Sequence, residues 1–144
     1  MFQWRQEIGQ LIDYLATRPD VDVTNVAYTG VSFGSSVALP LLAVEPRLKA
    51  AVLQLAGFTY RDMLPEVEAV NYAPRITIPV LMLEARYDHL FPVELSQQPL
   101  MSLLGSPGEQ KRQVLFDAGH RPLPRGQVIH EALAWLDRYL GPVR

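Results

Sequence analysis

Three residues of the sequence have side chains that together can activate an oxygen nucleophile: Ser32, Asp88 and His120. A serine hydroxyl is too weak an acid to attack a carbonyl carbon unaided, so it requires a base beside it. A histidine supplies that base, and a carboxylate holds the histidine in the tautomer that accepts the proton. These residue types in one site predict acyl transfer through a covalent serine intermediate.

Ser32 stands in a pentapeptide, Gly30-Val31-Ser32-Phe33-Gly34, that has the G-x-S-x-G form of a nucleophile elbow. An apolar, strand-like segment precedes it and a helical segment follows, which is the context that this sharp turn requires. The glycines leave room for the turn, and the backbone N–H of Phe33 is the natural donor to an oxyanion. A glycine-rich turn with a capping serine is the alternative. The placement between strand and helix favours the elbow.

The acid and the base each lie in a loop after a later strand-like segment. Asp88 follows the apolar residues 80–84, and His120 follows residues 113–116. Ligands of open parallel sheets bind outside the carboxyl ends of the strands. Both loops are therefore expected at the same edge of the sheet as Ser32.

Other residues of the same types are the alternatives. Glu84 and Asp117 compete for the role of the acid, and an acid in such a loop can also simply stabilise a turn. His89 and His130 fit the role of the base less well, because one lies beside the acid and the other within the last helix. A solvent-exposed loop histidine is the remaining alternative. No cluster of His, Asp and Glu has metal-ligand spacing, so the sequence predicts neither a metal site nor a cofactor.

Apolar periodicity predicts helices and strands in alternation. Helices are expected at 4–15, 35–44, 95–104 and 128–140, and strands at 26–29, 50–56, 80–84 and 113–116. This order indicates an α/β fold with three layers, α/β/α, around a mostly parallel sheet of about four strands. We find no domain boundary within residues 1–144. The proline-containing connection at 57–79 is expected to wall a pocket.

The composition excludes several classes of protein. A net charge of -2 with no run of Lys or Arg argues against a nucleic-acid partner. The absence of cysteine excludes disulfides, thiolate metal sites and a Cys nucleophile. We recognise neither a signal peptide nor a membrane span, and therefore favour a cytoplasmic location, with Met1 interpreted as an internal methionine.

With the chain order Ser, Asp, His, the sequence resembles the C-terminal half of an α/β-hydrolase of the dienelactone-hydrolase or prolyl-oligopeptidase-like type. The segments that carry this resemblance are Arg18-Pro19-Asp20-Val21-Asp22, Val44-Glu45-Pro46-Arg47, Tyr87-Asp88 and Gly119-His120. The resemblance implies an eight-stranded sheet of which this chain holds the equivalents of strands five to eight.

The same resemblance implies that the strands before the elbow strand are absent. The second oxyanion donor, which in the family follows the third strand, is absent with them, and losing one such donor costs about a hundred- to a thousandfold in rate. The strand at 26–29 would then be an exposed apolar edge. We expect a homodimer through this edge, or pairing with the missing N-terminal half of the same domain. A truncated gene model or fragment is the simplest hypothesis.

The predicted function is hydrolysis of a carboxylic ester, a thioester or a short acyl-amide by a serine hydrolase. A substrate pocket is expected from apolar residues of the connection and the acid loop: Phe58, Tyr60, Met63, Leu64 and Phe91. Packing in the core is the other role such residues play. The alternative functions are an exopeptidase of prolyl-oligopeptidase type and a non-catalytic fragment or binding module that lacks the oxyanion loop.

Overall fold

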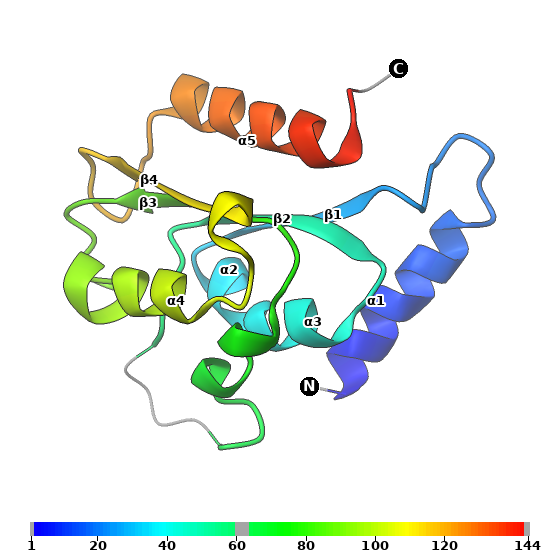
Figure 1. The fold of residues 1–144 in the computed structure, drawn as a ribbon, viewed down its shortest axis with the longest axis horizontal. Coiled ribbons are helices and arrows are strands. Elements are labelled where there is room, and N and C mark those ends of the chain that lie inside the picture. The colour runs from blue at the N-terminus through cyan, green and yellow to red at the C-terminus, as the bar shows by residue number, and fades with distance from the viewer. Residues whose placement is uncertain (1, 60–63, 143–144) are drawn as a thin grey trace.

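The protein is built on a parallel sheet of four strands (Figure 1), seen in a computed structural model that describes residues 2–59 and 64–142. The strands are β1 (Val26–Val31), β2 (Leu48–Gln54), β3 (Val80–Ala85) and β4 (Lys111–Phe116). They lie in the order β1-β2-β3-β4, and every neighbouring pair is parallel. The predicted α/β class with a parallel sheet is therefore confirmed, and β1 lies at one edge of the sheet.

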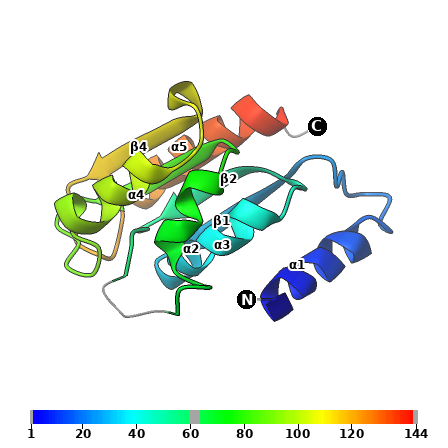
Figure 2. The same cartoon turned by 60° about the horizontal axis from the view of Figure 1, so that its bottom comes forward.

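Among the residues that the structure describes, five α-helices flank the sheet. They are α1 (Phe2–Leu15), α2 (Phe33–Val37), α3 (Leu39–Val44), α4 (Gln98–Leu103) and α5 (Arg125–Leu140). Short helical turns are the 3-10 helices η1 (Ala69–Asn71), η2 (Ala73–Arg75) and η4 (Gly108–Gln110), and the π-helix η3 (Val93–Gln97). Helix α5 covers one face of the sheet, while α2, α3 and α4 cover the other (Figure 1). Helix α1 lies beside α3 (Figure 2). Its Asp13 pairs with Arg47, in the turn after α3, at 2.6 Å.

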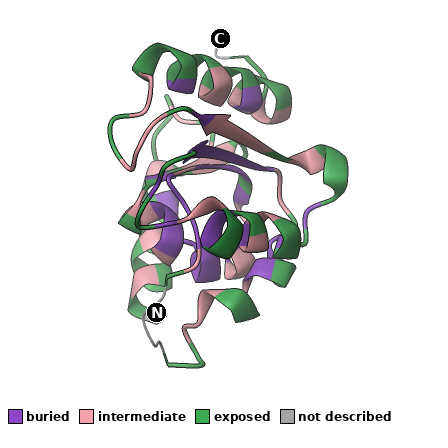
Figure 3. Cartoon of the chain, turned by 90° about the vertical axis from the view of Figure 1, so that its left-hand side faces the viewer, coloured by how far each residue is buried: buried purple, intermediate pink, exposed green. Residues whose placement is uncertain are grey.

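The two faces of β3 belong to two separate cores, because successive side chains of a strand point to opposite faces. Val80 and Met82 pack in the core under α3 and α4, whereas Leu81 and Leu83 pack with Trp135 of α5. All six residues of β3 are buried. Figure 3 shows the buried residues in the sheet and on the inward faces of the helices. The sheet is thereby a rigid base for the loops at its carboxyl edge.

Two predicted helices are interrupted, and each interruption coincides with a proline. The segment 35–44 forms two helices, α2 and α3, with Pro40 in the first turn of the second. The segment 95–104 forms the π-helix η3 followed by α4, with Pro99 in the first turn of α4. Proline has no N–H to continue the hydrogen-bond ladder, but it is well accommodated in a first turn.

Candidate active site

Ser32 occupies a strained turn between β1 and α2. Its backbone lies at φ 54° and ψ -115°, a combination that costs a residue with a side chain about 1–3 kcal/mol. The turn is held because the Ser32 N–H donates to the Gln54 carbonyl at 2.8 Å, and the Ser32 carbonyl accepts from Ser35 at 3.0 Å. A Cβ on Gly30 would lie 2.9 Å from the backbone of Gly34, so this position requires glycine. The turn directs the serine side chain away from the sheet.

The three residues singled out in the sequence meet at the carboxyl edge of the sheet. Ser32 Oγ lies 2.7 Å from Nε2 of His120, and Nδ1 of His120 lies 2.8 Å from Oδ2 of Asp88. The Asp88 carboxylate is buried, and its Oδ1 accepts the N–H groups of Leu90 and Phe91 at 2.8 and 3.0 Å. An acid, a base and a hydroxyl are thus connected in one line of hydrogen bonds.

The competing carboxylates are engaged elsewhere. Both oxygens of the Glu84 carboxyl lie 2.9 Å from the N–H of Ala56. Burial raises the pKa of Glu84 well above its usual range; the Ala56 hydrogen bond opposes this rise and the charge of Asp88 adds to it. Asp117 is exposed and accepts from Arg86 at 2.8 Å. Asp88 is therefore the carboxylate that faces the imidazole of His120.

The other two histidines lie outside this line of hydrogen bonds. His89 is exposed, and its ring lies edge-on to that of His120 at 6.2 Å between centroids. His130 is exposed on α5. Within residues 2–59 and 64–142, no three His, Asp or Glu side chains are grouped so that they could hold a metal ion.

A cavity of about 620 Å³ opens beside Ser32. Its described lining is mostly apolar and comes from α1, the elbow, α2, α3, the connection after β2 and the Asp88 loop. The lining residues are Trp4, Ser32, Phe33, Ser36, Val37, Pro40, Gly57, Thr59, Val67, Glu68, Ala69, Leu90 and Phe91. Residues of the 57–79 connection thus line this cavity.

The residues predicted for the pocket have different positions. Phe91 lines the cavity, and its ring lies 5.9 Å from that of His120. Phe58 packs against the core under α3 and α4, and Leu64 is exposed. Tyr60 and Met63 lie outside the described residues. The sequence did not point to Trp4, because only tertiary packing brings α1 to this cavity.

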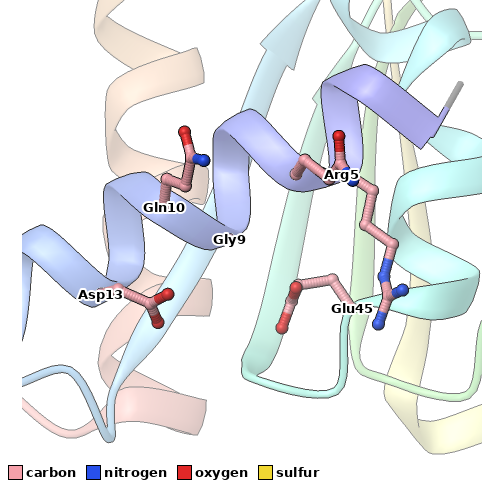
Figure 4. Close-up of a pocket in the computed structure, with 6 residues that line it drawn as sticks. Arg5, Gly9, Gln10, Asp13 and Glu45 are labelled. Atoms are coloured by element: carbon pink, nitrogen blue, oxygen red, sulfur yellow. The ribbon is translucent and has the colours of Figure 1, made fainter.

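A second depression lies between α1 and the turn after α3 (Figure 4). Its volume is about 380 Å³, and its lining is largely polar: Arg5, Gln6, Gly9, Gln10, Asp13 and Glu45. The Arg47 guanidinium, hydrogen-bonded to Glu45 at 2.7 Å, holds the pKa of that carboxyl below its usual range. Ser32, Asp88 and His120 do not line this depression, and two of its carboxylates, Asp13 and Glu45, pair with Arg47 in the turn after α3.

A parallel sheet with helices on both faces, and a serine at a strained turn between a strand and a helix, are the features of the α/β-hydrolase fold. The chain belongs to the dienelactone hydrolase family, whose family model matches residues 3–120. No helix among the described residues is long and apolar enough to cross a membrane.

Named relatives are similar over most of this chain but are longer. The cutinase est2 of Thermobifida alba is 27% identical over 146 residues, which cover 94% of this chain and 44% of the cutinase. A thiohydrolase of Eupenicillium brefeldianum is 35% identical over 92 residues, covering 56% of this chain and 30% of the thiohydrolase. The zinc-bound structure of a cold-adapted esterase from an Arctic intertidal metagenomic library superimposes with a TM-score of 0.77, at 24% identity, over 94% of this chain and 57% of the esterase. The chain therefore spans less than half of these two sequence relatives.

Proposed function

We propose that this chain carries the catalytic residues of a serine hydrolase that cleaves a carboxylic ester, a thioester or a short acyl-amide. The observation that carries the proposal is the hydrogen-bonded line from Ser32 through His120 to Asp88. The proposal is supported by family membership and by relatives named as a cutinase, an esterase and a thiohydrolase.

We propose a role for each of these atoms. Ser32 Oγ attacks the carbonyl carbon while its proton passes to Nε2 of His120, and the Asp88 carboxylate stabilises the resulting imidazolium. The tetrahedral oxyanion faces the Phe33 N–H. When the intermediate collapses, His120 returns the proton to the leaving alcohol, thiol or amine, and an acyl-serine remains. Water activated by His120 then attacks the acyl-serine and releases the acid.

The apolar cavity is the proposed site for the acyl group of the substrate. It begins at Ser32, and Phe91 and Val67 contribute apolar wall. A volume of about 620 Å³ lies within the usual range for small-molecule pockets, roughly 300–1,000 Å³. We therefore propose a small ester or thioester with an uncharged acyl group as the substrate.

A second oxyanion donor is proposed to come from a segment that packs along the β1 edge. Val31, next to the nucleophile, is 41% exposed at this edge. Unpaired edge strands are templates for pairing with another segment. Either a second copy of the chain or further residues of the same domain would meet this requirement. If a second copy of the chain meets it, the rate of reaction per Ser32 rises with protein concentration.

Intact-mass labelling with a fluorophosphonate tests the proposal. The wild-type chain is expected to gain one adduct, and Ser32→Ala and His120→Ala are expected to gain none. Ser102→Ala, which removes an exposed hydroxyl on α4, is the matched control and should label as the wild type does. Circular dichroism establishes that each variant is folded. A folded wild-type chain without an adduct contradicts the proposal and favours a non-catalytic binding module. Ester and peptide libraries then separate an esterase from an exopeptidase.

A further inference from the structure

Gln97 is a fully buried side chain whose amide joins the two ends of the loop that carries Asp88. Its Nε2 donates to the carbonyl of Ala85 at 3.0 Å and to the carbonyl of Phe91 at 2.8 Å. Its Oε1 accepts from Gln113 of β4 at 3.3 Å. Ala85 is the last residue of β3, so one side chain fixes the start and the end of the loop at 85–91.

The chemistry of this position requires a side-chain amide. Two backbone carbonyls accept hydrogen bonds and cannot donate them, so the group between them must present two donors. The amide of Gln97 supplies both donors and also one acceptor, and it needs no charge. Because the site is buried, a carbonyl here that has no hydrogen bond from position 97 has no water to bind instead, and this costs free energy of folding. A carboxylate at position 97 would place oxygen against oxygen.

The clamped loop leads directly to the acid. The same Phe91 whose carbonyl accepts from Gln97 donates its N–H to Oδ1 of Asp88 at 3.0 Å. The other oxygen of Asp88 faces Nδ1 of His120 at 2.8 Å. The position of Gln97 is itself fixed by the π-helix η3, which it ends and where its N–H reaches back to the Pro92 carbonyl at 3.4 Å. Such π-helical turns are frequent at functional sites.

We propose that Gln97 is a positioning residue, which holds the Asp88 carboxylate in place against His120 by clamping both ends of the loop 85–91. This inference rests on the proposed function, since it assigns a role to a residue that supports the same site. Gln97 acts through Phe91 and Asp88 and does not touch the substrate.

The test compares Gln97→Met with a matched control. Methionine keeps the length of the side chain and removes both donors. Ser106→Ala is the control, because the buried Ser106 hydroxyl also bonds two carbonyls, those of Ile76 and Ile78. These carbonyls precede the start of β3, whereas Asp88 follows its end. The rate of fluorophosphonate labelling should fall by up to about a hundredfold in Gln97→Met, which is the cost of a misplacement of about 1 Å. It should stay within about twofold of wild type in folded Ser106→Ala, because Ser106 lies away from the reacting groups.

A spectroscopic readout keeps the test independent of activity. The proton between Nδ1 of His120 and Asp88 gives a resonance downfield of the amide region in selectively ¹⁵N-histidine-labelled protein, assigned with His120→Ala. This resonance should be present in the wild type and in Ser106→Ala, and absent from Gln97→Met. If the wild type shows the resonance but does not label, the proposed function fails, and the resonance alone decides the role of Gln97.

A double-mutant cycle separates positioning from general destabilisation. In the Asp88→Asn background, adding Gln97→Met should lower the labelling rate no further, because the group that Gln97 positions has been changed already. Additive effects overturn the inference, and so does a Gln97→Met variant that keeps both the resonance and the wild-type rate. If Gln97→Met does not fold, Gln97→Asn, which keeps the amide but is one methylene shorter, is judged by the same criteria.

Discussion

Ser32 Oγ and His120 Nε2 lie 2.7 Å apart, although they follow the two outermost strands of the sheet, β1 and β4. Three strand spacings separate those strands, which amounts to about 14 Å. The segment after β4 must therefore run back across the carboxyl edge to bring His120 to the serine. It is tied on the way to the loop after β3, where the Tyr87 N–H donates to the Ala118 carbonyl at 3.0 Å. The alignment of His120 with Ser32 thus depends on the conformation of two segments, the loop after β3 and the segment after β4.

Asp88→Asn is expected to remove most of the reactivity of Ser32. An asparagine in this place favours the wrong tautomer of His120 and does not stabilise its charged form, and such a change lowers the rate by about 10⁴-fold in a comparable triad. Fluorophosphonate labelling kinetics measure the effect. Asp117→Asn, which changes the exposed competing carboxylate, is the control and should leave the rate unchanged. A large loss in Asp117→Asn instead would assign the acid to that residue.

Gly30→Ala is expected to disrupt the turn at Ser32. The new Cβ would meet the backbone of Gly34 and Ser35 at 2.9 Å, so the turn itself has to move. We expect a loss of about 1–3 kcal/mol in the free energy of unfolding, as for an overpacked site, together with slower labelling. Gly126→Ala on α5 is the control, because a Cβ there has no neighbour within 4 Å. Because Gly126 lies in the first turn of α5, alanine there should raise stability by less than the roughly 0.5–1 kcal/mol that it gains in the middle of a helix. Urea unfolding compares the two variants, and equal stabilities would contradict the expectation.

The sequence predicts those features that local patterns encode. The G-x-S-x-G motif placed Ser32 at a strand-to-helix turn, and turns after strands placed Asp88 and His120 at one edge of the sheet. The clamp by Gln97 has no such pattern, since its partners at positions 85, 91 and 113 become neighbours only through tertiary packing. The same holds for Trp4 in the cavity wall. Three predicted strands are one or two residues shorter than the observed ones, because pairing with neighbouring strands extends them. The strand predicted at 50–56 is instead shifted to 48–54, and it ends before Leu55, whose φ is 52°.

Glu84→Gln is expected to make stability less dependent on pH. Folding raises the pKa of Glu84 above its usual 4.5, mainly through burial, so the native protein retains a proton that the unfolded chain releases. The wild type therefore loses stability as the pH rises from about 4.5 towards the pKa of the folded state. Glutamine carries no ionisable proton. Within this pH interval, the Tm of Glu84→Gln minus the Tm of the wild type should therefore increase as the pH rises. At pH values below the interval, this difference should be constant.

Thermal melts at several pH values measure this difference. Glu7→Gln, at an exposed position on α1, is the control, and its Tm is expected to follow that of the wild type. A difference between Glu84→Gln and the wild type that stays the same from pH 4 to pH 8 would show that Glu84 is not held protonated by the fold.

Glu68→Gln is expected to change the charge preference of the acyl site. Among the described residues that line the cavity, Glu68 is the one with a formal charge. A carboxylate on the acyl chain would lie in the same apolar cavity. At an effective dielectric constant of about 20, two like charges roughly 12 Å apart repel by about 1.4 kcal/mol, which is about tenfold in rate. The wild type should therefore prefer an uncharged acyl chain.

A matched pair of substrates isolates the repulsion between Glu68 and a charged acyl chain. The pair is p-nitrophenyl hexanoate and the mono-p-nitrophenyl ester of adipic acid, which has the same number of carbons but ends in a carboxylate. The ratio of their kcat/KM values in the wild type should favour hexanoate, and Glu68→Gln should reduce that ratio by up to about tenfold, chiefly by raising kcat/KM for the adipate ester. Added salt should reduce the ratio in the wild type, because it screens exposed charges at this range. Since Gln keeps the volume of Glu, hexanoate itself should be hydrolysed at the wild-type rate. An unchanged ratio in the variant would place the charged end of the chain outside this cavity and would assign the acyl group to another surface beside Ser32.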